Sequence, residues 1–222
     1  MPTPITLSAT VLRCNPLRLE EEFRALEAAG ASELHFDLSD GVTAPNLGLN
    51  VETIAAARAV SGLRCAAHLL LEQPQRQIAA LAKAGCHTVL IQAETCAHGH
   101  RVLGQIRDAG VSPGVAISPS TPLTLLEYLL PLADRVLVLA AEPGGRAGDP
   151  HLLLERVRIL HENIRYREYR TDIQVEAPVD ATLIAGLSQT GARSLVCDSP
   201  ADPDGGYAAV MRAACDTVLG HK

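Results

Sequence analysis

The chain has 222 residues, of which 47% are hydrophobic and 20% are charged, and its formal net charge is −6. This composition is typical of a globular protein with one sizeable core, and the negative charge argues against a nucleic-acid-binding surface. With two phenylalanines, four tyrosines and no tryptophan, the chain also has few side chains that could stack on bases.

The sequence contains no apolar run long enough to cross a membrane, and its N-terminus has no basic segment followed by an apolar one. We therefore expect neither membrane association nor a signal peptide. The six cysteines show no C-x-x-C spacing, and a chain with a core of this size does not need a disulfide framework. These features predict a protein of the reducing cytoplasm.

Apolar segments and amphipathic segments alternate along the whole chain. In chain order, the predicted pairs are strand 5–9 and helix 19–29, strand 33–38 and helix 51–60, strand 63–69 and helix 75–84, strand 88–92 and helix 98–109, strand 111–117 and helix 122–132, strand 135–139 and helix 152–165, strand 172–176 and helix 181–189, and strand 194–197 and helix 207–219. The strands are apolar with little alternation, as expected when both faces of a parallel sheet are covered.

Glycine follows four of the predicted helices, at Gly30, Gly85, Gly110 and Gly191. Glycine favours this position because it tolerates the left-handed backbone that ends many helices. Pro122 is predicted in the first turn of its helix, where its missing N–H costs nothing.

Eight strand–helix units without a linker predict one domain over residues 1–222, and eight parallel strands favour a closed (β/α)8 TIM barrel. An open doubly wound sheet is the main competing architecture. However, no glycine-rich dinucleotide fingerprint and no P-loop follows any predicted strand.

Functional side chains of a TIM barrel gather at the C-terminal ends of its strands. His35 and Asp37 lie two residues apart on the second strand, so their side chains share a face; His68 is near the end of the third strand, and Glu176 ends the seventh. Such a set can hold one divalent ion, and the side chains do not choose among Zn²⁺, Fe²⁺, Mn²⁺ and Co²⁺. The simpler interpretation of each histidine alone is a buried side chain satisfied by a neighbouring carboxylate.

Other polar residues at strand ends are weaker candidates. Gln92 and Glu94 end the fourth strand, whereas His98 and His100 are expected on the solvated surface. The long segment 142–149 after the sixth strand is either a lid over the site or only a loop.

Two sequence signatures give the chain a family resemblance. The signature H-x-D-x-x-D-G-x-x-x-P-N is matched by His35, Asp37, Asp40, Gly41, Pro45 and Asn46. A second signature, which begins at the end of the third strand, is matched by His68, Leu69, Pro74 and Arg76. From residue 5 to about residue 200 the sequence resembles the ribulose-phosphate 3-epimerase family.

The resemblance implies a metal-dependent epimerase on a (β/α)8 barrel, with His35, Asp37, His68 and Glu176 as metal ligands. The family chemistry removes a proton from the carbon beside a ketone and returns one to the opposite face. This needs a carboxylate on each side, here Asp37 and Glu176, and a cation to hold the enediolate. The expected substrate is a small sugar or sugar phosphate inverted at C3, and by family analogy the protein is expected to form a homo-oligomer.

The resemblance also predicts the residues that contact the substrate. They are Thr10, Gly144, Gly145, Arg146, Asp198 and Ser199. The family's Asp-Gly-Gly after the seventh strand is replaced by Glu176-Ala177-Pro178, and its Gly-Ser after the eighth strand is replaced by Asp198-Ser199. Pro178 has no N–H for a phosphate, and the carboxylate of Asp198 would repel one.

We therefore expect D-ribulose 5-phosphate to be a poor substrate, unless Arg146 in the expected lid binds its phosphate. An epimerase of an unphosphorylated or otherwise altered sugar is the nearest alternative. A catalytically silent barrel that binds a ligand or partner, and a different metal-dependent aldolase or isomerase, also remain open.

Overall fold

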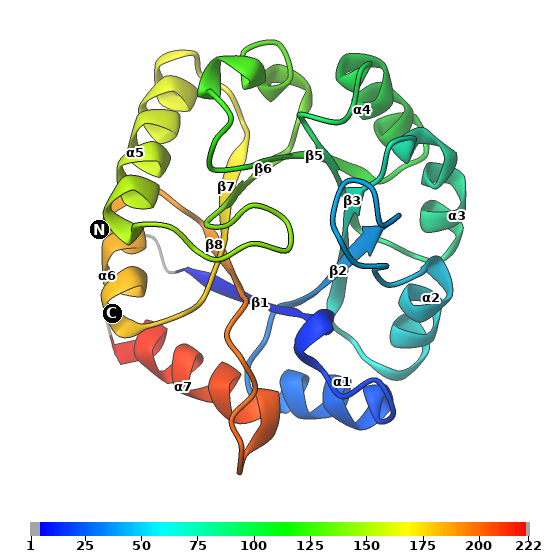
Figure 1. The fold of residues 1–222 in the computed structure, drawn as a ribbon, viewed down its shortest axis with the longest axis vertical. Coiled ribbons are helices and arrows are strands. Elements are labelled where there is room, and N and C mark those ends of the chain that lie inside the picture. Colours follow the sequence, from blue (N-terminus) through cyan, green and yellow to red (C-terminus); the bar gives the residue numbers. More distant parts are fainter. Residues whose placement is uncertain (1–4, 221–222) are drawn as a thin grey trace.

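Eight parallel strands close into a barrel in the computed structural model, which describes residues 5–220 (Figure 1). The strands are β1 (Thr6–Thr10), β2 (Glu33–Ser39), β3 (Arg64–Leu70), β4 (Thr88–Gln92), β5 (Ser112–Ile117), β6 (Arg135–Leu139), β7 (Asp172–Ala177) and β8 (Ser194–Cys197). Each strand pairs with the next one along the chain, and β8 pairs with β1. The predicted TIM barrel is confirmed, and the open doubly wound sheet is excluded.

Helices surround the barrel on its outer side (Figure 1). The α-helices are α1 (Leu19–Ala28), α2 (Val51–Val60), α3 (Ile78–Lys83), α4 (Gly99–Asp108), α5 (Pro150–Tyr166), α6 (Ala181–Thr190) and α7 (Gly206–Gly220). Short 3-10 turns are η1 (Val11–Arg13), η2 (Pro74–Arg76), η3 (Leu123–Leu126) and η4 (Leu130–Leu132). Within the described residues, no helix is long and apolar enough to span a membrane. The predicted domain span of 1–222 includes residues 1–4 and 221–222, which lie outside the described residues.

The predicted helix over 122–132 is wrong, because the structure has the two separate 3-10 turns η3 and η4 in its place. Pro131 lies inside the predicted helix, has no N–H for the helical hydrogen bond and would clash with the preceding turn. Pro122 precedes η3 with an extended ψ of 137° instead of occupying a helical turn. The four helix-ending glycines were predicted correctly, since all have φ between 77° and 96°.

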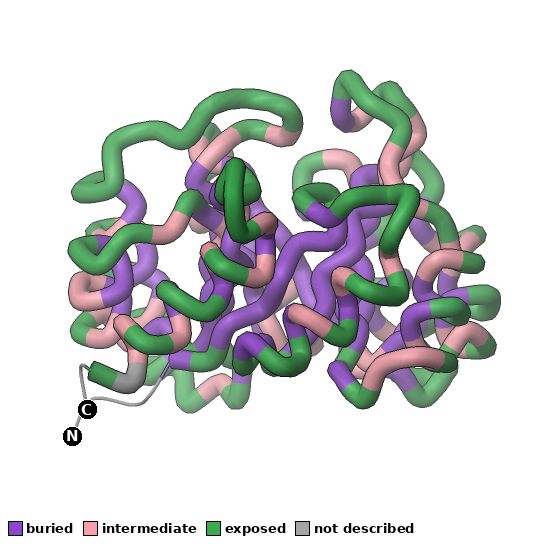
Figure 2. The backbone as a smooth tube through the Cα atoms, turned by 90° about the horizontal axis from the view of Figure 1, so that it is seen from below, coloured by how far each residue is buried: buried purple, intermediate pink, exposed green. Residues whose placement is uncertain are grey.

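Strand β2 alternates between its two faces, which the general pattern of apolar strands did not predict. Leu34, Phe36 and Leu38 belong to the large hydrophobic cluster between barrel and helices, where Phe36 packs edge-on against Phe23 of α1 at 6.3 Å between ring centroids. The alternate residues face the barrel interior and are Glu33, His35 and Asp37. Buried residues run through the middle of the molecule and exposed ones lie along its rims (Figure 2).

The middle of the barrel interior is apolar. It is filled by a second, smaller cluster of buried side chains, which are Ala66, Leu90, Ala116, Leu137, Leu139 and Val196. This apolar layer separates polar groups near the strand N-termini from those near the strand C-termini.

A buried ion pair closes the N-terminal end of the barrel. Arg135 Nη1 lies 2.6 Å from Glu33 Oε1, which also accepts a hydrogen bond of 3.1 Å from the Ser8 hydroxyl. Burial alone would raise the pKa of Glu33, but the charge and hydrogen bond of Arg135 outweigh it and hold the pKa below its usual value. Removing Arg135 would leave the Glu33 carboxylate buried without an opposite charge.

We predict that Arg135→Met lowers the free energy of unfolding by about 3–5 kcal/mol at neutral pH, because it leaves the Glu33 carboxylate buried and unpaired. The pKa of Glu33 is lowered in the folded state, so its contribution is present above its unfolded pKa and is lost as the pH falls. Urea unfolding at pH 7 and at pH 4 should therefore show a smaller loss at pH 4.

Arg193→Met is the matched control, since Arg193 lies 3.4 Å from Asp172 in an exposed pair. We expect this control to change stability by about 1 kcal/mol or less. Equal losses in the two variants would contradict the importance of the buried pair.

Candidate metal centre

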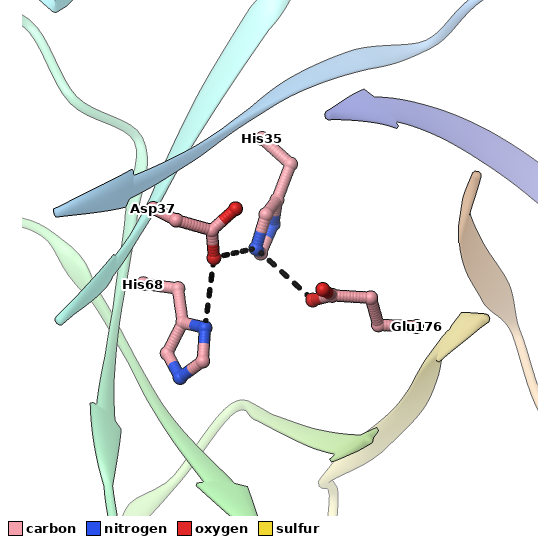
Figure 3. Close-up of side chains that lie close together, drawn as sticks. All are labelled: His35, Asp37, His68 and Glu176. Atoms are coloured by element: carbon pink, nitrogen blue, oxygen red, sulfur yellow. Dashed lines mark hydrogen bonds and ion pairs between the residues drawn. The ribbon is translucent and has the colours of Figure 1, made fainter. Parts of the chain in front are cut away.

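Three strands bring four ionisable side chains together at the C-terminal end of the barrel (Figure 3). Alternation along β2 turns His35 and Asp37 inward, the β2–β3 register places His68 beside Asp37, and Glu176 comes from β7. One potential ligand atom from each of these four residues lies within 4.8 Å of the others. The structure thus brings together the whole set that the sequence suggested.

His35, Asp37 and His68 are buried, Glu176 is partly buried, and the distances between the four side chains are short. His35 Nε2 lies 3.4 Å from Asp37 Oδ1 and 3.5 Å from Glu176 Oε2, while His68 Nδ1 lies 3.1 Å from Asp37 Oδ1. Among the described residues, neither ring nitrogen of His35 nor the Oε2 atom of Glu176 makes a hydrogen bond. Buried polar atoms without hydrogen bonds are costly. A bound cation would compensate His35 Nε2 and Glu176 Oε2, the two of these atoms that face the cluster.

The surroundings drive the two carboxyl pKa values apart. Burial would raise the pKa of Asp37, but His35 and His68 outweigh it and hold that pKa well below its usual range. Burial and the negative charge of Asp37 raise the pKa of Glu176 to about 7. Although burial opposes it, the pKa of His35 is raised to about 9, because Asp37 and Glu176 are close. In the metal-free cluster Asp37 is therefore ionised at neutral pH, whereas Glu176 exchanges its proton in that range.

A chain of buried hydrogen bonds orients His68. Its Nε2 atom lies 2.7 Å from Gln92 Oε1, and Gln92 Nε2 donates to Glu94 Oε2 at 2.6 Å and to Ser118 Oγ at 2.9 Å. Because the amide nitrogen faces a carboxylate, the amide oxygen faces His68 and accepts from its Nε2–H. The other ring nitrogen, Nδ1, is therefore the one that faces the cluster.

Thr10 supports the cluster from β1, since its hydroxyl donates to Asp37 Oδ2 at 3.3 Å.

Sequence reasoning ranked Gln92 and Glu94, at the end of the fourth strand, as weaker candidates. Their position two and four residues beyond Leu90, an inward residue of β4, was the available signal. The structure leaves His98 and His100 exposed, as expected.

A cavity of about 720 Å³ opens above the cluster, with Asp37, His68 and Glu176 at its base. Its walls come from the loops after the strands, and the segment 142–147 contributes much of the β6 side. Gly144 has φ +76°, and a Cβ there would lie 2.5 Å from Pro45 Cγ, so only glycine allows this loop to pack against the loop after β2.

Four of the six predicted substrate contacts line the cavity, namely Gly144, Gly145, Arg146 and Asp198. Thr10 and Ser199 do not line it, and both are buried behind its wall. The Ser199 hydroxyl instead accepts a hydrogen bond of 2.8 Å from the Val179 N–H.

Asp198 lies beside a positive charge that the sequence did not indicate. Its Oδ1 atom lies 2.8 Å from Arg13 Nε, and its carbonyl oxygen accepts a hydrogen bond of 3.4 Å from Arg13 Nη2. The carboxylate that was expected to repel a phosphate is therefore one half of an ion pair at the cavity wall. Sequence reasoning missed Arg13, because the loops after β1 and β8 become neighbours only when the barrel closes.

Comparisons with known proteins agree with this geometry. Residues 6–201 match the model of the ribulose-phosphate 3 epimerase family. The chain is 32% identical over 224 residues to ribulose-phosphate 3-epimerase 1 of Cupriavidus necator, covering 93% of this chain and 90% of that protein. It is 31% identical to ribulose-phosphate 3-epimerase of Synechocystis sp., covering 88% and 86%. Phosphoribosyl anthranilate isomerase from Thermus thermophilus shares the fold, with a TM-score of 0.69 at 14% identity over 98% of this chain and 100% of that one.

We predict that Glu176→Gln stabilises the metal-free protein at alkaline pH by about 3 kcal/mol, a magnitude that follows from its pKa of about 7. Since the folded-state pKa lies above the unfolded value, the cost of ionising Glu176 develops between about pH 4 and pH 7 and is complete above it. Urea unfolding after chelation should show this gain at pH 8.5 and little difference at pH 4.5.

Glu127→Gln changes an exposed glutamate, paired with Arg167 at 3.2 Å, and should have little effect at either pH. A gain from Glu176→Gln of the same size at both pH values would show that ionisation of Glu176 is not its cause.

Proposed function

The chain belongs to the ribulose-phosphate 3-epimerase family, and we therefore propose that it is a metal-dependent isomerase that inverts C3 of a ketose or ketose phosphate. The observation that carries this proposal is the pair Asp37 and Glu176, two carboxyl groups that meet at one cluster and whose pKa values are driven apart by their surroundings. Inversion at a carbon requires one group that removes a proton and another that returns one, and carboxyl groups with different pKa values suit these two roles.

One divalent ion is proposed to bind His35, Asp37, Glu176 and the Nδ1 atom of His68. The absence of a hydrogen bond to His35 Nε2 and to Glu176 Oε2 within the described residues supports this assignment, because a cation would compensate their burial. When bound, the ion would supply positive charge that stabilises the negative charge of an enediolate. Zn²⁺, Fe²⁺, Mn²⁺ and Co²⁺ all suit two imidazoles and two carboxylates.

The protein's own groups then carry the proton transfers. Ionised Asp37 removes the proton from C3, and the electrons of the C–H bond move toward the neighbouring carbonyl. Protonated Glu176 returns a proton to the opposite face of C3, which completes the inversion; the reverse reaction exchanges the two roles. Thr10 holds the Asp37 carboxylate by its 3.3 Å hydrogen bond, and the wall around 142–147 limits access of water.

For localisation, oligomeric state and binding partners, we keep the predictions made from the sequence. We expect a cytoplasmic homo-oligomer whose partner is its small-molecule substrate, without nucleic-acid or membrane binding. These features stay predictions.

Our prediction for the metal centre is that His35→Ala and His68→Ala each lose bound divalent metal and epimerase activity, because each removes one of four ligands. Elemental analysis of the purified variants measures the metal directly. A chelator should lower the melting temperature of the wild type but not that of these variants, since metal binding adds to folding stability.

His98→Ala is the matched control, because His98 is exposed and lies outside the cluster, and it should keep its metal. Wild-type metal content in both ligand variants would refute the assignment. Absence of metal from the wild type itself would favour a barrel that binds a ligand without catalysis.

The acid–base assignment predicts that Asp37→Asn and Glu176→Gln each abolish epimerisation. Each substitution keeps the size of the side chain and removes its ability to exchange a proton. NMR should follow incorporation of solvent deuterium at C3 of the sugar. Full exchange in both variants would place the proton transfers on other residues.

A further inference from the structure

At the ends of β7 and β8, three neighbouring backbone positions have no free N–H group to offer a phosphate. Pro178 has no N–H, the Val179 N–H donates to Ser199 Oγ at 2.8 Å, and the Asp198 N–H donates to Ala177 O at 3.0 Å. A phosphate dianion bound by backbone groups depends on several free N–H donors. These three positions supply none.

The side chains at the same end of the cavity form a mixed pair. Arg13 and Asp198 both line the cavity, with side chains 39% and 32% exposed, and are held together by the 2.8 Å contact from Nε to Oδ1. A guanidinium has five N–H donors, so after the bonds from Nε and Nη2 to Asp198 it keeps donors for a ligand. The Oδ2 atom of Asp198 has no hydrogen-bond partner among the described residues and can accept one.

This pair lies within electrostatic reach of the candidate metal centre. The negative charge of Asp198 is one of the smaller contributions that raise the pKa of Glu176, after burial and Asp37. A sugar with its reacting carbon at the cluster could therefore extend its remaining hydroxyl groups toward Arg13 and Asp198.

We propose that the Arg13–Asp198 pair is the specificity determinant of this cavity and selects the hydroxyl groups of an unphosphorylated ketose. A hydroxyl both donates and accepts, so neighbouring hydroxyls satisfy the free carboxylate oxygen and the free guanidinium N–H groups together. A phosphate dianion only accepts, and it would face the Asp198 carboxylate at short range. This inference rests on the proposed ketose epimerase, whose substrate class it narrows.

The test compares dissociation constants for D-ribulose and D-ribulose 5-phosphate, measured by titration of the metal-loaded protein. We expect the wild type to bind the free ketose at least about tenfold more tightly, because one lost charged hydrogen bond and one close like charge together cost that much or more. Asp198→Asn should shift the ratio toward the phosphate ester by about tenfold or more, since it removes the carboxylate charge and keeps Arg13.

Arg13→Gln should weaken binding of the free ketose and should not improve binding of the ester, because it leaves Asp198 unpaired. Asp172→Asn is the matched control: it alters another arginine–aspartate pair between β7 and the start of β8, at the opposite end of the barrel. Thermal unfolding of each variant confirms that it is folded, and the control should leave the ratio unchanged.

If the wild type binds D-ribulose 5-phosphate more tightly than D-ribulose, the inference is overturned. If Arg146→Ala then loses this tighter binding, the phosphate lies at the loop that contains Arg146. An unchanged ratio in Asp198→Asn would overturn the inference as well. Binding is measured separately from turnover, so the two proposals can fail independently. Selective binding of D-ribulose without deuterium exchange at C3 would contradict the proposed epimerase activity. It would still agree with substrate selection by Arg13 and Asp198.

Discussion

The central constraint on this protein is the burial of four ionisable side chains inside the end of a closed barrel. Groups of this kind are stable away from water only when charges and hydrogen bonds compensate one another. Asp37 is compensated by His35, His68 and Thr10, and His68 is compensated by Gln92. The compensation is incomplete at His35 and Glu176, and this local deficit makes the cluster a candidate metal centre instead of a structural polar core.

The same barrel contains a second buried charge at its other end, and β2 contributes to both. Glu33 pairs with Arg135 below the apolar layer, whereas Asp37 meets the histidines above it. The two clusters differ in how fully their polar atoms are hydrogen-bonded. Glu33 has an arginine, a serine and a glutamine as partners, whereas atoms of His35 and Glu176 lack hydrogen bonds within the described residues. A complete network suits stability, and an incomplete one suits binding and chemistry.

The fold and the four residues of the cluster could be predicted from sequence because both depend on short-range patterns. Alternating strands and helices fix the barrel, and the spacing of His35 and Asp37 fixes their common face. The sequence predictions that failed have two kinds of cause, one local and one that depends on contacts between distant parts of the chain. The helix over 122–132 failed because the effect of Pro131 was overlooked. The Arg13–Asp198 pair and the contact of Gln92 with His68 depend on closure and register, which residue spacing alone does not determine.

The orientation of the Gln92 amide has a consequence for how the centre is filled. It keeps a proton on Nε2 of His68, so Nδ1, 3.1 Å from Asp37 Oδ1, is the atom that points into the cluster. A cation at this centre would therefore meet His68 through Nδ1 alone. A side chain that is not itself a ligand thus decides which ring nitrogen can become one.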